Sequence, residues 1–367
     1  MRICIDATAL LLRSAGVKNY IYHWLVSLRR EAREDSLVTF PFFTGFGELD
    51  HERSMVGPLT TVGALALLHG LNISGLPWSL PKLDVFHASH HAQNPPRRAR
   101  LTTTVHDMTC WLRPELHSRA NVTATRGFGE RIMKLADGIL AVSENSRADA
   151  AAVLGIDEKK IEVVYPGVAE AFFDVGAEDV LELREALRLE RPYVLFVGTI
   201  EPRKNVPGLL AAYAGLSAAI REEYELVVAG PVGWADQATL EQLRSAPSVR
   251  RLGYIPEDAL PALTAGASAL VYPSFYEGFG FPVVQAMAAG VPVITSGVSS
   301  LPEVAGDAAL LVDPESTAEI RDALERLLTS PSLREQLGGR GRIRARKFRW
   351  ETTARQSLEF FHRIAGG

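Results

Sequence analysis

The chain of 367 residues contains little cysteine, and Cys4 and Cys110 are the only two. They lie far apart, so they predict neither a disulfide framework nor a zinc site, which is typical of a reducing compartment. No apolar run reaches the ~18 residues that a membrane-spanning helix needs, and the nearest, 62–71, is expected to be an ordinary helix. The first residues, MRICID, are expected to form a strand and show no signal-peptide pattern. We therefore expect a cytoplasmic protein.

The sequence also lacks the marks of nucleic-acid and metal binding. The net charge of −4 gives no basic signature for nucleic acid. There is no Asp-x-Asp motif, and no Cys/His cluster has metal spacing. His87, His90 and His91 suggest a metal site, but no nearby carboxylate completes it, so a loop of unpaired histidines is expected. The basic cluster PPRRAR at 95–100 is either a solvated loop or a contact for anionic lipid or an anionic acceptor.

Short apolar runs and helical patterns alternate along the chain. With 47% hydrophobic residues and a length above the ~250–300 residues of a single core, two α/β domains with parallel, doubly covered sheets are expected. The expected strands are 2–7, 37–43, 84–88, 101–105, 138–142, 161–165, 193–197, 225–229, 269–272 and 291–295. The expected helices between them include 18–31, 121–136, 144–154, 206–220 and 282–289.

A break between the domains is expected where an acidic, loosely patterned stretch follows Pro166 and Gly167. This gives an N-terminal domain over 1–168, a linker over 169–190 and a C-terminal domain over 191–349. The tail, 350–367, has helical spacing.

Polar groups follow four of the expected strands. They are His106, Ser143, the motif GTIEPRKN at 198–205 and the motif PSFYEGFG at 273–280. Ligands of open parallel sheets bind outside the carboxyl ends of the strands, so these groups are expected at ligand-binding edges. Ser143 is either a residue of the cleft or the N-cap of the next helix.

Two of these motifs carry charges. In the first, Gly198 allows close backbone approach, and Arg203 and Lys204 either grip a diphosphate or are exposed helix-start charges. In the second, Glu277 precedes an expected helix start at Pro282, whose unpaired amides attract anions. A carboxylate there either accepts from sugar hydroxyls or caps the helix. Gln285, eight residues later, is either a ligand contact or a solvent-facing residue.

Three longer stretches carry a family resemblance. They are GTIEPRKN, the stretch from RLGYIPEDAL to GVPVITS (251–296), and SSLPEVAGDAALLVDP. They resemble the retaining family-4 glycosyltransferases (glycosyl transferases group 1) of GT-B fold, in the mannosyltransferase-like branch. SAGVKNY, VHD and AVSENSR match more loosely, and the tail FRWETTARQSLEFF is similar to the family's closing helix, which crosses back to the first domain. The resemblance implies two Rossmann-like domains that face each other across a cleft.

The resemblance also implies roles for individual residues. Glu277 and His106 would contact the transferred sugar and act as the catalytic pair. Arg203 and Lys204 would grip the donor diphosphate, with Gly16 near the donor phosphates. The remaining donor-binding residues would be Gly278, Phe279, Gly280, Val283, Gln285 and Ser143. Gln285 stands where the family usually has a second glutamate that holds the ribose. Its loss of charge is expected to weaken donor binding by about 1 kcal/mol, or several-fold.

The expected reaction is metal-free, retaining transfer of a hexose from a nucleotide-sugar, with no other cofactor. GDP-mannose ranks ahead of a UDP-sugar as the donor, and the acceptor is a hydroxyl on a glycan or lipid-linked carrier of cell-envelope biosynthesis. Peripheral contact of the N-terminal domain with the inner membrane surface is permitted by 62–71 and by its slightly basic charge. The oligomeric state is left open.

Other functions remain open at this point. Gln285 supports a non-catalytic GT-B protein that binds a nucleotide-sugar or glycan. A sugar-nucleotide epimerase would need an extra carboxylate pair, a phosphorylase a longer chain or a pyridoxal lysine, and a solute-binding protein an export signal. None of these features is found.

Overall fold

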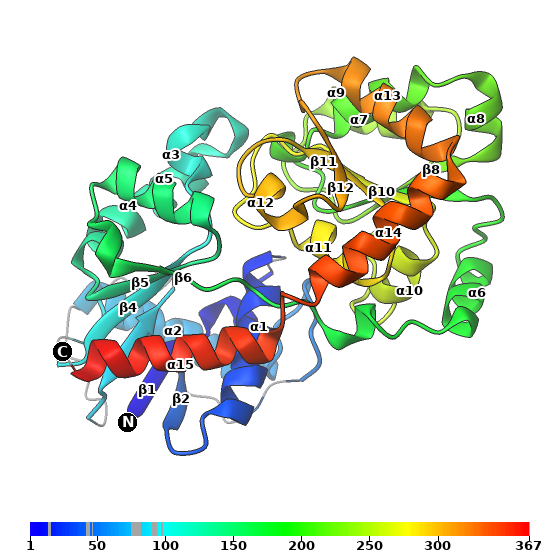
Figure 1. Cartoon of the computed structure of the whole chain (residues 1–367). Coiled ribbons are helices and arrows are strands. Elements are labelled where there is room, and N and C mark those ends of the chain that lie inside the picture. The colour runs from blue at the N-terminus through cyan, green and yellow to red at the C-terminus, as the bar shows by residue number, and fades with distance from the viewer. Residues whose placement is uncertain are drawn as a thin grey trace. The chain divides into compact units, whose positions relative to one another are not determined.

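The structure is a computed structural model that describes residues 1–13, 16–41, 45, 47–74, 82–89, 94–96 and 98–366, with the backbone alone at 71–74. The chain divides into two compact units (Figure 1). Unit 1 consists of Met1–Pro114, Arg119–Gly167 and Arg349–Gly367, and unit 2 of Glu115–Ser118 and Val168–Phe348. Residues of the sequence motifs that fall in the gaps, among them Ser14, His90, His91 and Arg97, lie outside the described residues.

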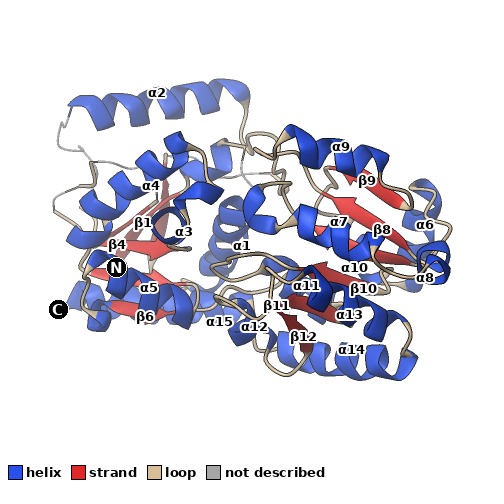
Figure 2. Cartoon of the chain, turned by 90° about the horizontal axis from the view of Figure 1, so that it is seen from above, coloured by secondary structure: helices blue, strands red, loops and turns tan. Residues whose placement is uncertain are grey.

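Unit 1 contains a six-stranded parallel sheet with the order β2-β1-β3-β4-β5-β6. Helices cover both faces of the sheet (Figure 2), which explains why the central strands are buried runs of apolar residues. The strands are β1 (Arg2–Asp6), β2 (Ser36–Phe40), β3 (Val85–Ala88), β4 (Arg100–Val105), β5 (Gly138–Ala141) and β6 (Ile161–Val163). The helices are η1 (Thr8–Leu11), α1 (Gly16–Glu31), α2 (Pro58–Ser74), α3 (Thr109–Leu112), α4 (Arg119–Arg131), η3 (Met133–Leu135), α5 (Glu144–Leu154), η4 (Glu158–Lys160) and α15 (Trp350–Gly366), and η2 (Pro114–Leu116) runs from unit 1 into unit 2.

The last helix, α15, packs along α1 and completes the core of unit 1. The Trp24 ring of α1 lies 6.1 Å from the Phe361 ring, and its indole Nε1 donates to the Ser357 hydroxyl at 3.0 Å. The His87 ring at the end of β3 packs edge-on against both aromatic rings. The tail is therefore an integral layer of unit 1, although more than 180 residues of unit 2 separate it from the rest of that unit.

Unit 2 contains a second six-stranded parallel sheet, ordered β12-β11-β10-β7-β8-β9. Its strands are β7 (Tyr193–Val197), β8 (Glu225–Ala229), β9 (Val249–Gly253), β10 (Ala269–Tyr272), β11 (Val293–Ser296) and β12 (Ala309–Val312). The sequence did not predict β9 and β12. Both are edge strands with partly exposed residues, and β9 has a pair of arginines where a buried strand would be apolar. The expectation of an α/β fold with parallel, doubly wound sheets is confirmed.

The helices of unit 2 flank this sheet. They are η5 (Glu170–Phe172), α6 (Ala177–Ala186), η6 (Pro202–Lys204), α7 (Val206–Ala214), α8 (Ala218–Glu223), α9 (Gln237–Ser245), α10 (Leu260–Ala265), α11 (Phe281–Ala288), α12 (Leu301–Ala305), α13 (Thr317–Leu328) and α14 (Pro331–Ala345). Residues 169–190, which the sequence suggests as a linker, contain η5 and α6, and α6 packs on α10. This segment is folded as part of unit 2.

Candidate active site

The strand order of unit 2 identifies its ligand-binding edge. From β7 the chain proceeds outward to β8 and β9, and it then returns to the other side of β7 to form β10. The loops that follow β7 and β10 therefore diverge from neighbouring strands. In open α/β sheets such a switch point is where ligands bind. The loop after β7 carries Arg203 and Lys204, and the loop after β10 carries Glu277.

These two loops are joined by a buried ion cluster. The Lys204 ammonium donates to Glu277 Oε1 at 2.6 Å, and Arg203 Nη1 donates to Glu277 Oε2 at 2.6 Å. The Arg203 Nη1 also donates to the Tyr276 carbonyl at 2.9 Å, and Lys204 bonds to the Tyr272 hydroxyl. Glu277 is 6% exposed and Lys204 is 8% exposed. Glu277, which the sequence singled out for the sugar, thus contacts both cations that it singled out for the diphosphate.

Burial and charge act in opposite directions on this cluster. Burial raises the pKa of Glu277, but the charges and hydrogen bonds of Arg203 and Lys204 outweigh it and lower that pKa to about 2. Burial, followed by the charge of Arg203, lowers the pKa of Lys204, and Glu277 opposes this shift. Burial and the negative charge of Glu277 raise the pKa of Tyr272 well above its usual value, so its phenol is neutral. At neutral pH the carboxylate is therefore ionised and bonded to both cations.

A second carboxylate, Glu201, holds Arg203 from its other side. Glu201 Oε1 lies 3.1 Å from Arg203 Nε and 2.8 Å from Nη2, and Glu201 is buried. The sequence analysis missed Glu201, although it stands two residues before Arg203 in GTIEPRKN. With it, the cluster has two cations and two carboxylates and is electrically balanced without a ligand.

Hydrogen bonds and one left-handed residue hold the two loops in position. Asn205 has a left-handed conformation (φ 53°), caps α7 through its side chain and donates to the Pro314 carbonyl at 2.7 Å. In the other loop, the Glu277 amide donates to Ser299 Oγ at 3.0 Å, and the Ser300 hydroxyl donates to the Glu277 carbonyl at 2.9 Å. The segment after β11 therefore positions the backbone of Glu277.

The helix α11 begins directly after the loop that carries Glu277. Gly280 has a φ of 99°, and a Cβ there would lie 2.6 Å from Leu301 Cδ2, so glycine is required on both counts. The amides of Val283 and Val284 donate to the Gly280 carbonyl at 3.0 and 3.4 Å. These two amides of the helix start, which the sequence suggested would be unpaired, are therefore already engaged within the helix. Phe279 packs against Phe281, and the Phe279 ring and the Val283 side chain are both buried, so their contact with a donor stays a prediction.

Gln285 lies on α11 and is 8% exposed, so the solvent-facing alternative is wrong. Within the part of the chain that the structure describes, its side-chain amide has no hydrogen-bond partner. Gln285 does not belong to the residues whose side-chain nitrogen or oxygen atoms are both fully buried and unpaired, so its amide still reaches the surface. A ligand hydroxyl would therefore have access to it.

Three of the predicted residues lie in unit 1. His106 follows β4, and its ring packs edge-on against Tyr20 of α1 at 4.9 Å between centroids. Tyr20 in turn contacts Trp350, at the start of α15. Gly16 begins α1 one turn before Tyr20, is exposed, and has open space where a Cβ would stand. Unit 1 thus brings His106 and the start of α1 to one region.

Ser143 is the N-cap of α5. Its Oγ accepts from the Ser146 amide and donates to Ser146 Oγ, both at 3.0 Å, and the residue is fully buried. Of its two expected roles, the structure shows the cap, and contact with a donor stays a prediction.

The suggested metal site is not assembled in the described residues. His87 bonds Thr102 Oγ1 and Thr104 Oγ1, each at 3.0 Å, and burial lowers its pKa to about 3, so the ring is neutral. The described ranges contain no group of three His, Cys, Asp or Glu residues arranged to bind a metal ion. His90 and His91 lie outside those ranges.

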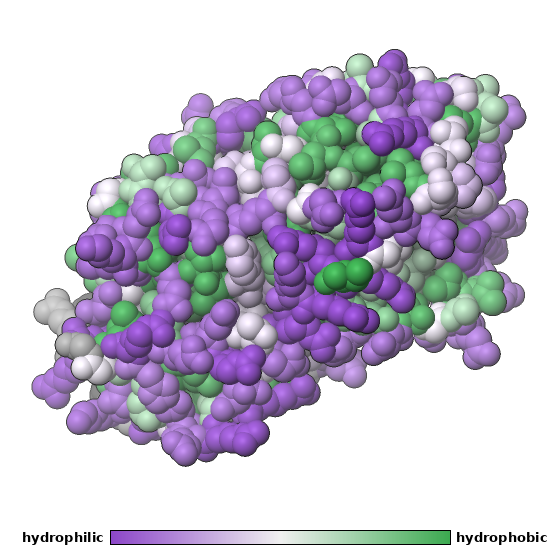
Figure 3. All heavy atoms as spheres, viewed as in Figure 1, coloured by the Kyte–Doolittle hydropathy of each residue, from purple (hydrophilic) through white to green (hydrophobic). Residues whose placement is uncertain are grey.

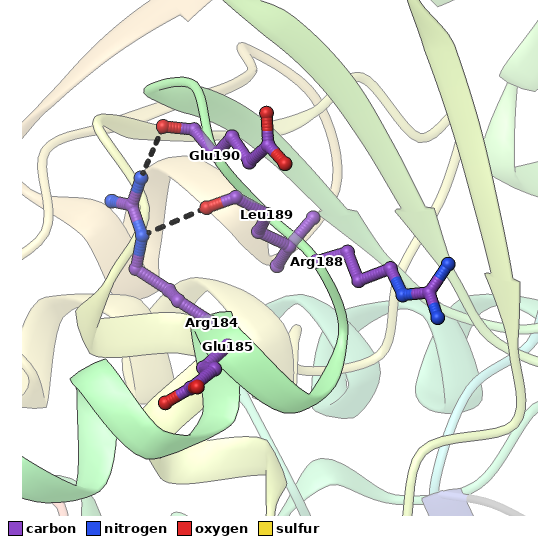
Figure 4. A pocket seen from close by; sticks show the side chains of 5 residues that line it. All are labelled: Arg184, Glu185, Arg188, Leu189 and Glu190. Atoms are coloured by element: carbon purple, nitrogen blue, oxygen red, sulfur yellow. Dashed lines mark hydrogen bonds between the residues drawn. The ribbon is translucent and has the colours of Figure 1, made fainter.

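A surface hollow of about 570 Å³ lies elsewhere on unit 2, at the end of α6. Figure 4 shows Arg184 pointing back to the carbonyls of Leu189 and Glu190, at 3.1 and 3.3 Å. Because Arg184 is engaged in capping α6, we assign this hollow a structural role.

Two family descriptions match the chain. "Glycosyl transferases group 1" matches residues 180–344, and "Glycosyltransferase Family 4" matches residues 14–172. The first range contains Arg203, Lys204 and Glu277, and the second contains His106. Each match therefore covers predicted site residues of one half of the sequence.

Individual relatives of this chain are also glycosyltransferases by name. The O-antigen chain mannosyltransferase B of Escherichia coli is 35% identical over 279 residues, which are 74% of this chain and 73% of that protein. The serotype-specific mannosyltransferase WbdA of E. coli is 30% identical over 62% of this chain but only 29% of its own length. The structure of Anabaena Alr3699/HepE in complex with UDP-glucose shares the fold, with a TM-score of 0.72 over 98% of this chain and 99% of that one, at 18% identity. From the ion cluster at the switch point, the two family matches and the first of these relatives, we conclude that the chain belongs to the group 1 glycosyl transferases of family 4, glycosyltransferases of GT-B fold.

Proposed function

We propose that the protein transfers a mannosyl residue, with retention and without a metal ion, from a nucleotide-sugar to a hydroxyl of a glycan or lipid-linked acceptor. GDP-mannose is the first candidate donor. The observation that carries the proposal is the contact of Glu277 with Arg203 and Lys204 at the switch point of unit 2. The names of the two E. coli relatives support mannose and polysaccharide biosynthesis.

In this proposal the donor diphosphate takes the place of Glu277 on the two cations. As the bond between the anomeric carbon and the phosphate oxygen breaks, negative charge develops on the leaving diphosphate. Arg203 and Lys204 stabilise that charge, an effect that is often worth ~3–4 kcal/mol for each well-placed donor. The acceptor hydroxyl forms the new bond on the same face of the sugar, and its proton passes to the leaving phosphate.

The displaced Glu277 carboxylate is then available to accept hydrogen bonds from sugar hydroxyls. We assign His106 of unit 1 to the same sugar and Gln285 to the ribose. A neutral Gln285 binds a ribose hydroxyl less strongly than a carboxylate, so the affinity for the donor is expected to be several-fold lower than with glutamate.

A UDP-sugar is the second candidate donor. The Anabaena protein that shares the fold is described in complex with UDP-glucose. A non-catalytic, donor-binding role is the second candidate function, and the neutral residue at position 285 is the observation that favours it.

We further propose that unit 1 contacts a membrane surface through α2. In this helix Leu59 is 90% exposed and Val62 is 67% exposed, and no residue of the helix carries a formal charge. No described helix is long and apolar enough to cross a bilayer.

The test is a thermal-shift panel of UDP, GDP, ADP and their common sugar conjugates, with and without EDTA. A ligand at a hundredfold excess over its dissociation constant stabilises the protein by ~2.7 kcal/mol. A shift with one nucleotide that survives EDTA, followed by transfer from its mannose conjugate, supports the proposal. Absence of any shift would refute donor binding, and a shift without transfer to any glycan acceptor would favour the non-catalytic role.

A further inference from the structure

The outer surface of α14 near its C-terminal end combines cations with an exposed aliphatic residue. Arg342, Ile343, Arg346 and Lys347 are all exposed, and Ile343 is 69% exposed. The helical path continues past Ala345, because the Lys347 amide donates to the Arg344 carbonyl at 3.1 Å. Residues three and four apart share a helix face, so Ile343 lies beside Arg346 and Lys347.

Other arginines of the same helix have structural partners. Arg344 donates to the carbonyls of Glu303 and Val304 at the end of α12, and Arg340 pairs with Asp307 at 3.5 Å. By contrast, Arg342, Arg346 and Lys347 form no ion pair or side-chain hydrogen bond within the described ranges. Their charges are therefore available to an external anion.

The helix dipole does not explain this surface. It favours a cation in the last turn of a helix, but it gives no reason for an aliphatic side chain at the centre of the cations. Figure 3 shows an apolar spot within a strongly hydrophilic area over this end of α14. An apolar side chain among cations on long, flexible stems is typical of helix faces that lie at a charged lipid surface.

We propose that Arg342, Ile343, Arg346 and Lys347 form a docking surface for an anionic membrane, which we call the α14 surface. The cations would bind lipid phosphates, and Ile343 would enter the boundary between headgroups and acyl chains. An acidic protein would satisfy the cations but would not need an aliphatic residue that stands out from the surface. The α14 surface belongs to unit 2, whereas α2 belongs to unit 1.

The adjoining face of α14, next to Arg342, whose side chain lies over Gly290, connects this surface to the candidate site. It packs on α11, the helix that carries Gln285. A Cβ at Gly338 would lie 2.3 Å from the Gly290 carbonyl oxygen, and one at Gly341 would lie 3.2 Å from Met287 Cα. These glycines allow α14 to pack closely on the C-terminal end of α11.

The test measures co-sedimentation of the full chain with vesicles of phosphatidylcholine alone and with vesicles that also contain phosphatidylglycerol. We expect binding to the anionic vesicles that falls as salt is added. Each cation near such a surface contributes about five-fold in partitioning, so R342Q/R346Q/K347Q should lower it on the order of 100-fold. Ile343→Ser should weaken binding without changing its dependence on salt.

Matched variants separate this surface from general charge and from α2. The triple variant R244Q/R251Q/R326Q removes three exposed cations elsewhere on unit 2 and should bind like the wild type. The variant L59S/V62S tests α2 in the same assay. Circular dichroism and thermal melting check that each variant is folded, and Ile343→Ser provides a second test if the triple variant is not.

Equal sedimentation with both kinds of vesicle, or unchanged binding by the folded triple variant, would overturn the proposal. Loss of binding in L59S/V62S alone would assign the membrane contact to α2 instead. Failure to bind vesicles, together with concentration-dependent self-association in sedimentation velocity, would assign the α14 surface to a second copy of the chain. The inference is independent of the transfer chemistry, because the nucleotide thermal shift does not depend on vesicle binding.

Discussion

The Lys204 ammonium and the Glu277 carboxylate lie 2.6 Å apart in a buried pair. Two groups proposed to bind different parts of the donor, its diphosphate and its sugar, are therefore bound to each other in this structure. In the proposed function, a donor would break this pair, and its diphosphate would replace the charge that Lys204 loses. Free nucleoside diphosphate and the carboxylate would then compete for the same cation.

The first prediction concerns Glu277→Gln. Because the neutral amide competes less well for Lys204 and Arg203, the variant should bind free GDP or UDP at least as tightly as the wild type, while sugar transfer falls by two orders of magnitude or more. Removal of one partner of a buried pair also lowers stability, by up to ~3–5 kcal/mol. Isothermal titration calorimetry, a transfer assay and urea unfolding measure the three effects.

The matched control for that prediction is Glu325→Gln, an exposed glutamate of α13, which should leave all three quantities unchanged. A clear loss of nucleotide affinity in Glu277→Gln would show that the carboxylate supports the diphosphate site instead of competing with the ligand.

The second prediction concerns Gln285→Glu. A carboxylate at this position should bind the ribose hydroxyls more strongly and tighten donor binding several-fold, by about 1 kcal/mol. The same charge would be buried without a described partner in the unliganded protein, so the melting temperature without donor should fall. Opposite changes in donor affinity and unliganded stability, measured by calorimetry and thermal melting, are the expected signature. A rise in both would contradict the unpartnered environment.

The third prediction concerns pH. The pKa of His87 is about 3 in the folded protein, against an ordinary value of 6.5, because of burial. The unfolded chain therefore binds a proton that the folded chain excludes, and stability falls as pH drops from 6.5 towards 3. Between pH 7 and pH 5 this one group should lower the free energy of unfolding by about 2 kcal/mol. Urea unfolding at the two pH values measures the loss.

His87→Gln is the matched variant for the pH prediction. It retains hydrogen-bonding capacity towards Thr102 and Thr104 but has no titrating group, so its stability should be correspondingly less sensitive between pH 7 and pH 5. An unchanged pH dependence in this variant would assign the acid sensitivity to other groups.

The fourth prediction concerns the junction between unit 1 and its last helix. A Cβ at Gly167 would lie 2.2 Å from the Trp350 backbone nitrogen, and backbone cannot move aside as a flexible side chain can. Gly167→Ala should therefore destabilise the protein by about 1–3 kcal/mol through overpacking. Gly57→Ala, where no atom lies within 4 Å, is the control and should melt within experimental error of the wild type. Equal melting temperatures for the two variants would show that the junction relaxes freely.

Much of the fold follows from local sequence patterns. The helix expected over 144–154 is observed as Glu144–Leu154, because Ser143 and Gly155 mark its two ends. The strand β9 was missed because an edge strand need not be apolar on both faces, and VRRLG contains two arginines. The strand β12, ALLV, is an apolar run that was not recognised as a strand. Pro282 predicted the start of α11, but the amides of Val283 and Val284 form hydrogen bonds within the helix, whereas the sequence suggested that they would be unpaired.

The candidate site was predicted residue by residue but not as a cluster. GTIEPRKN and PSFYEGFG identified Arg203, Lys204 and Glu277, since both motifs follow strands. That these side chains bind one another depends on β7 and β10 being neighbours, a relationship over about 70 residues that no local pattern contains. Glu201 was missed for the same reason, because its role appears only once the direction of the Arg203 guanidinium is known.

The place of α15 in unit 1 has a consequence for biosynthesis. Translation proceeds from the N-terminus, and domains generally fold as they leave the ribosome. Here the aromatic faces of Trp24 and His87 stay without Phe361 until nearly the whole chain has been made. All residues of unit 2 are synthesised before unit 1 is complete, although most of unit 1 precedes unit 2 in the sequence. Part of the core of unit 1 therefore stays exposed while unit 2 is synthesised, and such exposed apolar surface is what chaperones bind.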